Sequence, residues 1–238
     1  MNNKPVAVIT GAGGGIGSAI AKTVARLGYN IACLGGNNIQ KLESTQKSVS
    51  EISFCQIYPC NLNQIDKIKD SVLKIHEDFG RIDVVINNAG VALSKDFKDT
   101  TLEQYDNIMN VNCRAPYFTL QYCLPYLLKS NCATVINIGS VVSKEGYPLQ
   151  SAYSASKHAL IGWTKSFAKE YYDKNIRTYI ICPGGVYTDM VKTTRPDLTP
   201  EGMIMPEDIA DIVEFYLTHR SNAIIDEISV HRSNKIPF

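Results

Sequence analysis

Short apolar runs alternate with longer amphipathic stretches along almost the whole chain, and this alternation constrains the fold most. The runs lie at residues 6–9, 31–34, 54–58, 84–86, 135–138, 179–182 and 228–230. Between them apolar residues recur at helical spacing, as at 16–27 and 65–79. Nearly continuous apolar strands separated by helices predict a parallel sheet covered on both faces. Right-handed crossovers then give an α/β fold with one doubly wound sheet of about seven strands.

Composition supports one globular domain over residues 1–238. Of the 238 residues, 45% are hydrophobic and 20% are charged, and no low-complexity linker or repeat interrupts the series. A net charge of +1 gives no support for nucleic acid or an anionic membrane as a partner. The four histidines have no metal-ligand spacing, so no metal site is predicted.

Cysteine usage and the first residues bear on location. The seven cysteines form no C-x-x-C pair, and Cys33, Cys55 and Cys182 lie in apolar runs, which predicts buried free thiols. The chain enters a strand without an apolar leader and has no run of about 18 apolar residues. We therefore expect a cytoplasmic protein in a reducing compartment.

A glycine-rich turn follows the first apolar run. Residues 11–17 read Gly-Ala-Gly-Gly-Gly-Ile-Gly and lead directly into a helical pattern. Gly11, Gly15 and Gly17 fit Gly-x-x-x-Gly-x-Gly, whereas Gly-x-Gly-x-x-Gly is not satisfied. Glycines at such a turn let the backbone approach a pyrophosphate, and the helix N-terminus offers free N–H groups. A dinucleotide cradle is predicted, and a flexible turn without a ligand is the alternative.

A tyrosine, a lysine and a serine form a second candidate site. Tyr153 and Lys157 are four residues apart and share a face if residues 150–172 are helical. A neighbouring lysine cation favours phenolate, so the hydroxyl becomes a usable acid and base near neutrality. Ser140 lies thirteen residues before the tyrosine, and its hydroxyl is a candidate to hold the same substrate oxygen. A Tyr-x-x-x-Lys pair is common by chance, so its weight comes from the rest of the chain.

Together these motifs resemble the classical short-chain dehydrogenases/reductases over about residues 4–230. The residues that carry the resemblance are Thr10-Gly11-x-x-x-Gly15-Ile16-Gly17, Asn87-Asn88-Ala89-Gly90, Asn112, Ser140, Tyr153-x-x-x-Lys157 and Pro183-Gly184-Gly185-Val186-Tyr187-Thr188. The resemblance implies a Rossmann-type sheet and an NAD(P)-dependent oxidoreductase that interconverts a carbonyl and a secondary alcohol by hydride transfer.

The resemblance also implies catalytic roles. Tyr153 is expected to be the general acid in reduction and the base in oxidation, and Ser140 to orient the substrate carbonyl. Lys157 is expected to lower the pKa of the tyrosine and to hydrogen-bond the nicotinamide ribose. Asn112 is expected to hold a water that links Lys157 to solvent. A helix-capping or kink-stabilising role for Asn112 stays open, because Asn110 is close by.

The resemblance assigns cofactor contacts to the ends of several strands. Asn61 and Leu62 are expected at the adenine, where the family more often has aspartate, and Val186 and Thr188 at the nicotinamide carboxamide. For Asn88 a purely structural role, tying neighbouring strands together, is the alternative. The full expected set is Gly11, Gly13, Gly14, Gly15, Ile16, Gly17, Asn37, Asn61, Leu62, Asn88, Ala89, Gly90, Tyr153, Lys157, Pro183, Gly184, Val186 and Thr188.

The turn after the second strand bears on the choice of cofactor. An acidic residue there binds the ribose 2′-OH of NAD, and an arginine favours the 2′-phosphate of NADP. Residues 35–38 read Gly-Gly-Asn-Asn and carry neither charge, and Gly14 fills the family's other basic position. Small glycines leave room for a phosphate, to which Asn37, Asn38 or Lys41 can donate. We therefore expect NADP, with NAD or dual use as the alternative.

The longest irregular stretch, at about 187–206, predicts a substrate lid. It carries Pro196 and Pro200 beside Met190, Met203 and Met205, and a loop of that length in a compact domain is usually functional. With Tyr147, Pro148, Leu149 and Tyr187 these methionines predict an apolar pocket wall. The expected substrate is a small, apolar carbonyl or alcohol compound.

Two surfaces suggest partners. Apolar helices near 115–130 and 152–172 suit the four-helix contact that the family generally uses, so a homodimer or homotetramer is expected, although core packing also explains them. The lysines Lys129, Lys165, Lys169 and Lys174 indicate a solvated face, or alternatively a patch that docks a carrier protein.

Three functions stay in competition. The first is a general carbonyl or hydroxysteroid-type reductase or dehydrogenase. The second is 3-oxoacyl-[acyl-carrier-protein] reductase, against which residues 228–232 count because they lack a Val-Asp-Gly-Gly-like ending. The third, of another class, is a non-catalytic dinucleotide-binding sensor. A sensor tolerates losing Ser140, Tyr153 or Lys157, and this chain keeps all three. No Gly-x-Ser-x-Gly elbow supports a hydrolase.

Overall fold

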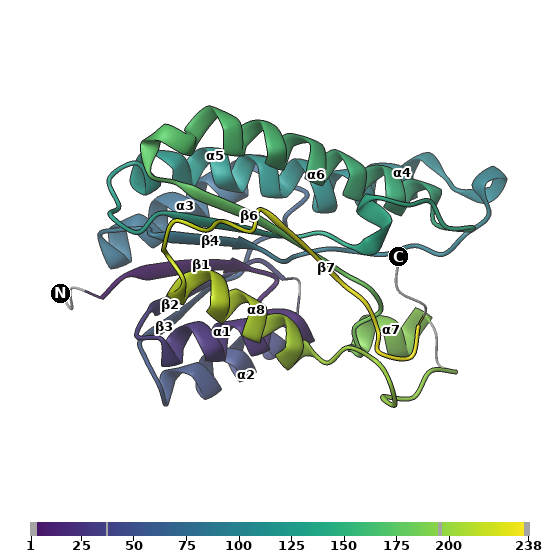
Figure 1. The fold of residues 1–238 in the computed structure, drawn as a ribbon, viewed down its shortest axis with the longest axis horizontal. Coiled ribbons are helices and arrows are strands. Elements are labelled where there is room, and N and C mark those ends of the chain that lie inside the picture. Colours follow the sequence, from purple (N-terminus) through teal and green to yellow (C-terminus); the bar gives the residue numbers. More distant parts are fainter. Residues whose placement is uncertain (1–3, 37, 195–196, 236–238) are drawn as a thin grey trace.

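The chain folds into one parallel seven-stranded sheet between two layers of helices (Figure 1). The structure is a computed structural model that describes residues 4–36, 38–194 and 197–235. The strands run in the order β3-β2-β1-β4-β5-β6-β7, and all of these neighbours pair in parallel. Their bounds are Val6–Thr10 (β1), Asn30–Leu34 (β2), Cys55–Tyr58 (β3), Val84–Asn87 (β4), Thr134–Ile138 (β5), Arg177–Pro183 (β6) and Glu227–Val230 (β7). The predicted doubly wound sheet is confirmed.

Helices cover both faces of the sheet. Figure 1 shows α1, α2 and α8 on one face and α3, α4, α5 and α6 on the other. Their bounds are Gly15–Arg26 (α1), Ile39–Ser50 (α2), Ile65–Phe79 (α3), Leu102–Met109 (α4), Ala115–Leu127 (α5), Ser151–Tyr171 (α6), Asp189–Thr194 (α7) and Pro206–Thr218 (α8). Short 3-10 turns lie at Phe97–Asp99, Val141–Ser143 and Tyr172–Lys174, and a π-helix lies at Asn110–Arg114.

The apolar strands are buried on both sides because their side chains alternate between two cores. In β1, Ala7 and Ile9 pack with residues of α1 and α8, whereas Val8 packs with residues of α3 and α5. In α3, Ile68, Val72 and Ile75 face the sheet at helical spacing, and the helix ends at Gly80 with φ +76°. The spacing of apolar residues therefore carries the layered architecture.

The segment expected to be irregular at 187–206 contains a helix, so that part of the prediction was wrong. Helix α7 begins at Asp189, whose carboxylate suits the positive end of the helix. The Lys192 N–H donates to the carbonyl of Thr188 at 3.0 Å and closes the first turn. Six residues are too few to show helical periodicity in a sequence, which explains why the helix was missed.

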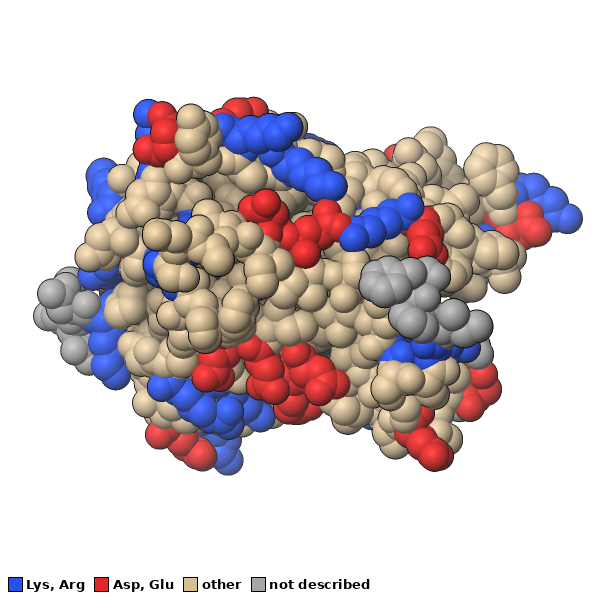
Figure 2. Space-filling view, in the orientation of Figure 1, with Lys and Arg blue, Asp and Glu red and all other residues tan. Residues whose placement is uncertain are grey.

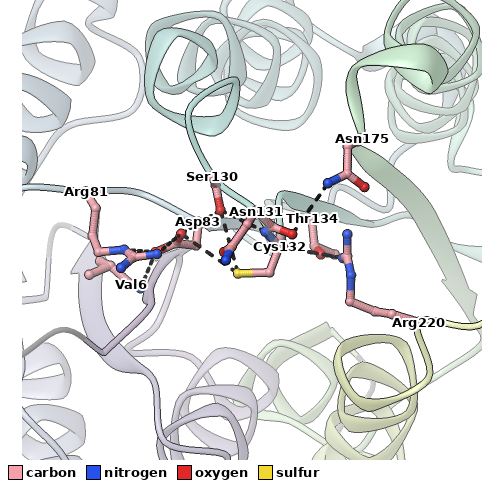
Figure 3. Close-up of polar contacts among 9 residues, drawn as sticks. All are labelled: Val6, Arg81, Asp83, Ser130, Asn131, Cys132, Thr134, Asn175 and Arg220. Carbon is pink, nitrogen blue, oxygen red and sulfur yellow. Dashed lines mark hydrogen bonds and ion pairs between the residues drawn. The ribbon is translucent and has the colours of Figure 1, made fainter.

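A buried carboxylate organises the amino edge of the sheet (Figure 3). Asp83, immediately before β4, accepts hydrogen bonds from the Val6 N–H at 2.8 Å and from the Ser130 hydroxyl at 2.6 Å. The Arg81 guanidinium adds two contacts of 2.8 Å. Burial raises the pKa of Asp83, but the hydrogen bonds from Arg81, Ser130 and Val6 outweigh it and hold the pKa below its usual range. Asp83 belongs to none of the sequence motifs described above.

The seven cysteines are free thiols, five of them buried, which confirms the prediction for Cys33, Cys55 and Cys182. Within the described residues, no helix has both the length and the apolar composition needed to cross a membrane.

Candidate active site

The predicted motifs meet at the carboxyl edge of the sheet, where loops after parallel strands converge. A cavity of about 480 Å³ opens there between the ends of β1, β3 and β4 and the segment after β6. Most of the expected cofactor contacts line it, namely Gly11, Gly14, Gly15, Ile16, Gly17, Asn61, Leu62, Asn88, Ala89, Gly90 and Thr188. This volume lies in the range of small-molecule and cofactor sites.

Close backbone packing explains the glycines of the turn. Gly11 has φ +66°, and a Cβ there would lie 2.8 Å from the Ala89 Cα. A Cβ on Gly17 would lie 2.3 Å from the Gly11 carbonyl oxygen. Gly13 packs against α2, because its Cβ would lie 3.2 Å from the Lys41 Cβ, and it does not line the cavity. A Cβ on Gly15 would lie 3.1 Å from the Thr188 Cγ2, so the turn packs directly against the segment after β6.

Asn88 ties β4 to β1 at the floor of the cavity. Its Nδ2 donates to the carbonyls of Thr10 at 3.0 Å and Gly11 at 3.2 Å. The Thr10 hydroxyl in turn accepts from the N–H groups of Asn88 and Ala89. The structural alternative for Asn88 is therefore present in the fold, while the residue also lines the cavity.

Tyr153 and Lys157 lie one turn apart on α6, as the spacing predicted. Lys157 is 4% exposed, and its ammonium lies 5.9 Å from the centroid of the Tyr153 ring and donates to the Ile138 carbonyl at 2.8 Å. Ser140 lies two residues beyond the end of β5 and caps the following 3-10 turn, its hydroxyl accepting from the Val142 N–H. The tyrosine, lysine and serine thus come together at the end of β5.

The expected lowering of the Tyr153 pKa is not found in this structure. Burial raises the pKa of the phenol, with a smaller opposing effect from a hydrogen bond with Ser140. Burial also lowers the pKa of the Lys157 ammonium to about 8, and Cys182 opposes this slightly. The prediction failed because it considered the charge pair without the cost of placing both groups in a poorly solvated site.

Asn112 lies in the π-helix and holds the loop after β4. Its Oδ1 accepts from the Val91 N–H and its Nδ2 donates to the Val91 carbonyl, both at 2.8 Å. A Cβ on Gly90 would lie 3.3 Å from the Asn112 Oδ1 and 3.7 Å from the Lys157 Nζ, so both side chains approach the same glycine. Asn110 instead accepts from Arg114. The Asn112 side chain thus bonds the loop after β4 and the Ser156 hydroxyl of α6, and it does so from a π-turn, a feature that often marks functional positions in helices.

Several expected contacts lie outside the cavity. The Gly184 N–H donates to the Val230 carbonyl at 2.8 Å, Val186 bridges to Ile204, and Pro183 is the last residue of β6. Asn37 lies outside the described residues. Met190, expected in the pocket wall, and Gly36, expected beside the phosphate, also line the cavity. Its lining residues that were not predicted are Cys60, Asn63, Val91, Asn107, Val111 and Asp189. Most directly adjoin a predicted residue, so extending each strand-end motif by one or two positions was the available signal.

Backbone conformation accounts for the glycines after β2. Gly35 and Gly36 have φ +88° and +93°, which an L-residue adopts only with strain. A Cβ on Gly35 would also lie 3.2 Å from the Leu62 side chain, so close packing requires glycine there as well, while Gly36 lines the cavity. The Asn38 Oδ1 is engaged as the cap of α2, accepting from the Lys41 N–H at 3.0 Å. Of the three expected donors, only Lys41 is described on the cavity wall.

Comparison with known proteins identifies the class. Residues 5–199 match the family model described as short chain dehydrogenase. The chain is 32% identical over 232 residues to a 3-oxoacyl-[acyl-carrier-protein] reductase of Thermotoga maritima, covering 94% of each. It is 32% identical over 209 residues to a D-beta-hydroxybutyrate dehydrogenase of Rhizobium meliloti, and the match covers 87% of this chain and 81% of that protein. The structure of an alcohol dehydrogenase from Thermococcus sibiricus, complexed with 5-hydroxy-NADP, superposes with a TM-score of 0.90 at 25% identity. The superposition covers 99% of this chain and 100% of that one. The chain therefore belongs to the short-chain dehydrogenase family and is an oxidoreductase of that family.

Proposed function

We propose that the enzyme interconverts a carbonyl and a secondary alcohol, with Tyr153 as the general acid and base. The observation that carries this proposal is the convergence of Tyr153, Ser140 and Lys157 at the sheet edge that also holds the glycine-lined cavity. The cavity suits a dinucleotide, because Gly11, Gly14, Gly15 and Gly17 line it at the N-terminus of α1, where backbone N–H groups can bind a pyrophosphate. A bound nicotinamide supplies or accepts the hydride.

The protein's own groups hold the substrate and move its proton. The Tyr153 hydroxyl donates a proton to the carbonyl oxygen in reduction and takes it back in oxidation. The Ser140 hydroxyl holds that oxygen so that the reacting carbon is oriented. Lys157 stabilises the phenolate that remains and binds the nicotinamide ribose. Asn112 positions the loop after β4 beside the Lys157 ammonium and holds the water through which the proton is replaced.

The substrate is a small compound with an apolar body, in the manner of a general carbonyl or hydroxysteroid-type reductase. Tyr147, Leu149 and Met190 are exposed apolar side chains, and Met190 lines the cavity. The alternative of an acyl-carrier-protein substrate has the support of the Thermotoga relative's name. Against it, two lysines of the candidate carrier-protein patch are already paired with acidic side chains of this chain. Lys165 pairs with Glu227 at 3.1 Å and Lys174 with Asp173 at 3.2 Å. Acidic and basic side chains also intermingle on the face shown in Figure 2.

The preferred cofactor is NADP. The absence of an acidic residue at 35–38 and the presence of Lys41 on the cavity wall support this choice. The Thermococcus enzyme, complexed with 5-hydroxy-NADP, is similar over its whole length. NAD or dual use is the alternative.

We also propose that residues 1–238 form one domain that assembles as a homodimer or homotetramer through α5 and α6. Tyr117 is 46% exposed on α5 and packs edge-on against Trp163 of α6. A shallow cavity of about 170 Å³ lies between the two helices and is lined mainly by aromatic and apolar side chains.

The proposed reaction is tested by nicotinamide absorbance with NADPH and NADH on a panel of ketones, aldehydes, 3-oxoacyl thioesters and 3-hydroxybutyrate. The Tyr153→Phe variant should lose at least about 100-fold in kcat, because general acids contribute 10²–10⁴-fold, and should keep cofactor affinity. A variant with more than about a tenth of wild-type kcat would exclude Tyr153 as the acid. Dinucleotide binding without turnover of any compound would favour the sensor.

A further inference from the structure

An ion pair joins two segments of the cavity wall that are distant in sequence. The Lys41 ammonium, in the first turn of α2, lies 2.7 Å from the carboxylate of Asp189, the first residue of α7. Both residues line the cavity, one beside the turn after β2 and the other beside the segment after β6. The pair therefore connects the wall expected at the adenosine ribose with the segment expected at the nicotinamide.

The charges around this pair are few. Among the described residues that line the cavity, Lys41 is the one cation and Asp189 the one anion. A second ammonium, that of Lys192, lies 3.7 Å from the other Asp189 oxygen but does not line the cavity. The side chains of Lys41 and Asp189 are 48% and 67% exposed, so water screens their attraction and a stronger anion can displace the carboxylate.

We propose that Asp189 is a cofactor-specificity residue that competes with the 2′-phosphate of NADP for the ammonium of Lys41. The inference rests on the proposed dinucleotide-binding function. The turn after β2 lacks the carboxylate that excludes a phosphate in NAD-dependent enzymes. Here the opposing carboxylate comes from α7, on the other side of the cavity. NAD lacks the phosphate and leaves the ion pair intact, whereas the 2′-phosphate of NADP displaces the Asp189 carboxylate from the Lys41 ammonium.

The chemistry of the two anions favours this exchange. A phosphate monoester carries about −1.5 to −2 charge at pH 7 and three acceptor oxygens, whereas a carboxylate carries one charge and two oxygens. Lys41 is held near the cavity by its backbone, since the Asn38 side chain caps the first turn of α2. Its long side chain needs only a rotation to leave Asp189. Asp189 thus reduces the preference for NADP without abolishing it.

Calorimetry with 2′,5′-ADP and 5′-AMP tests the competition on the intact protein, because the two probes differ only in the 2′-phosphate. Asp189→Asn should tighten 2′,5′-ADP about two- to fivefold, the scale of an exposed ion pair, and leave 5′-AMP unchanged. Lys41→Met should weaken 2′,5′-ADP about ten- to a hundredfold, because a charge-assisted contact to phosphate is lost. In the Lys41→Met background, Asp189→Asn should have no further effect.

Lys192→Met is the matched control, since it removes an ammonium from the same carboxylate at a position off the cavity wall. It should change 2′,5′-ADP affinity by less than about twofold. The proposal is overturned if Asp189→Asn still tightens 2′,5′-ADP without Lys41, which indicates direct repulsion of the phosphate. It is overturned equally if Lys192→Met weakens binding as much as Lys41→Met. A wild type that binds neither probe, nor NADPH or NADH, contradicts the proposed function itself.

Discussion

Asp83→Asn should destabilise the protein without damaging the cavity. The carboxylate is 1% exposed and accepts from the Val6 N–H, the Ser130 hydroxyl and the Arg81 guanidinium. Removing one partner of a buried ion pair costs about 3–5 kcal/mol. Because the Arg81 side chain is 33% exposed and can regain water, we expect the lower end, about 3 kcal/mol. For a chain of this size that corresponds to a fall in Tm of about 6–12 °C.

Urea unfolding and calorimetry at one protein concentration measure this loss. Asp70→Asn is the matched control, because its carboxylate is 67% exposed and lies 4.0 Å from Lys67, so its loss should cost less than about 0.5 kcal/mol. Cofactor affinity should be unchanged, since Asp83 lies at the amino edge of the sheet, away from the cavity. If Asp83→Asn fails to fold, Ser130→Ala should still cost about 1.5–3 kcal/mol through its lost 2.6 Å hydrogen bond.

The pH dependence gives an independent check. The folded-state pKa of Asp83 is held below its unfolded value of about 3.9, so its contribution is complete above that value and is lost as pH falls through the folded pKa. The difference in unfolding free energy between wild type and Asp83→Asn should therefore be constant near pH 7 and shrink below about pH 4. A difference under about 1 kcal/mol at pH 7, or one that grows in acid, would refute the reasoning.

Three further substitutions probe the site. Lys157→Met should lower both kcat and cofactor affinity by at least about tenfold, because one ammonium serves phenol and ribose; unchanged affinity for both dinucleotides in a fluorescence titration would remove the ribose contact. Gly15→Val should abolish dinucleotide binding in calorimetry while circular dichroism stays native, because its Cβ meets Thr188 at 3.1 Å beside the cavity; undiminished binding contradicts the cradle. Gly35→Asp should cost about 1–2 kcal/mol in urea unfolding, because φ is +88° and Leu62 is 3.2 Å away; full stability would show that this backbone is not strained.

The fold was predictable because its signal is local and repeated. Each apolar strand and amphipathic helix can be recognised from the pattern of a few neighbouring residues, and parallel pairing follows from their alternation. Asp83 was not predictable in this way, because its partners at Val6 and Ser130 are 77 and 47 residues away. In the sequence, an aspartate before an apolar run resembles any residue at the start of a strand. Its partners are evident only in the folded sheet.

Within the site, residue type was easier to predict than environment. The glycine turn and the residues Ser140, Tyr153 and Lys157 were found from motif and spacing, and the structure brings each group to the carboxyl edge of the sheet. The direction of the Tyr153 pKa was not found, because burial depends on tertiary packing. The Lys41–Asp189 contact joins residues 148 apart, and no local pattern indicates it.

The opposite effects of burial on Tyr153 and Lys157 predict how the reaction depends on pH. A raised phenol pKa keeps Tyr153 protonated at neutrality, which suits a proton donor in carbonyl reduction. The Lys157 pKa of about 8 means that its ammonium is present at pH 7 and is lost as pH rises through 8. We therefore expect kcat/KM for reduction to be flat between about pH 6 and 7 and to fall above about 8. Initial rates over pH 6–10 measure this profile, and the fall should vanish in Lys157→Met. A rate of reduction that rises through pH 8 would show that another group controls the proton.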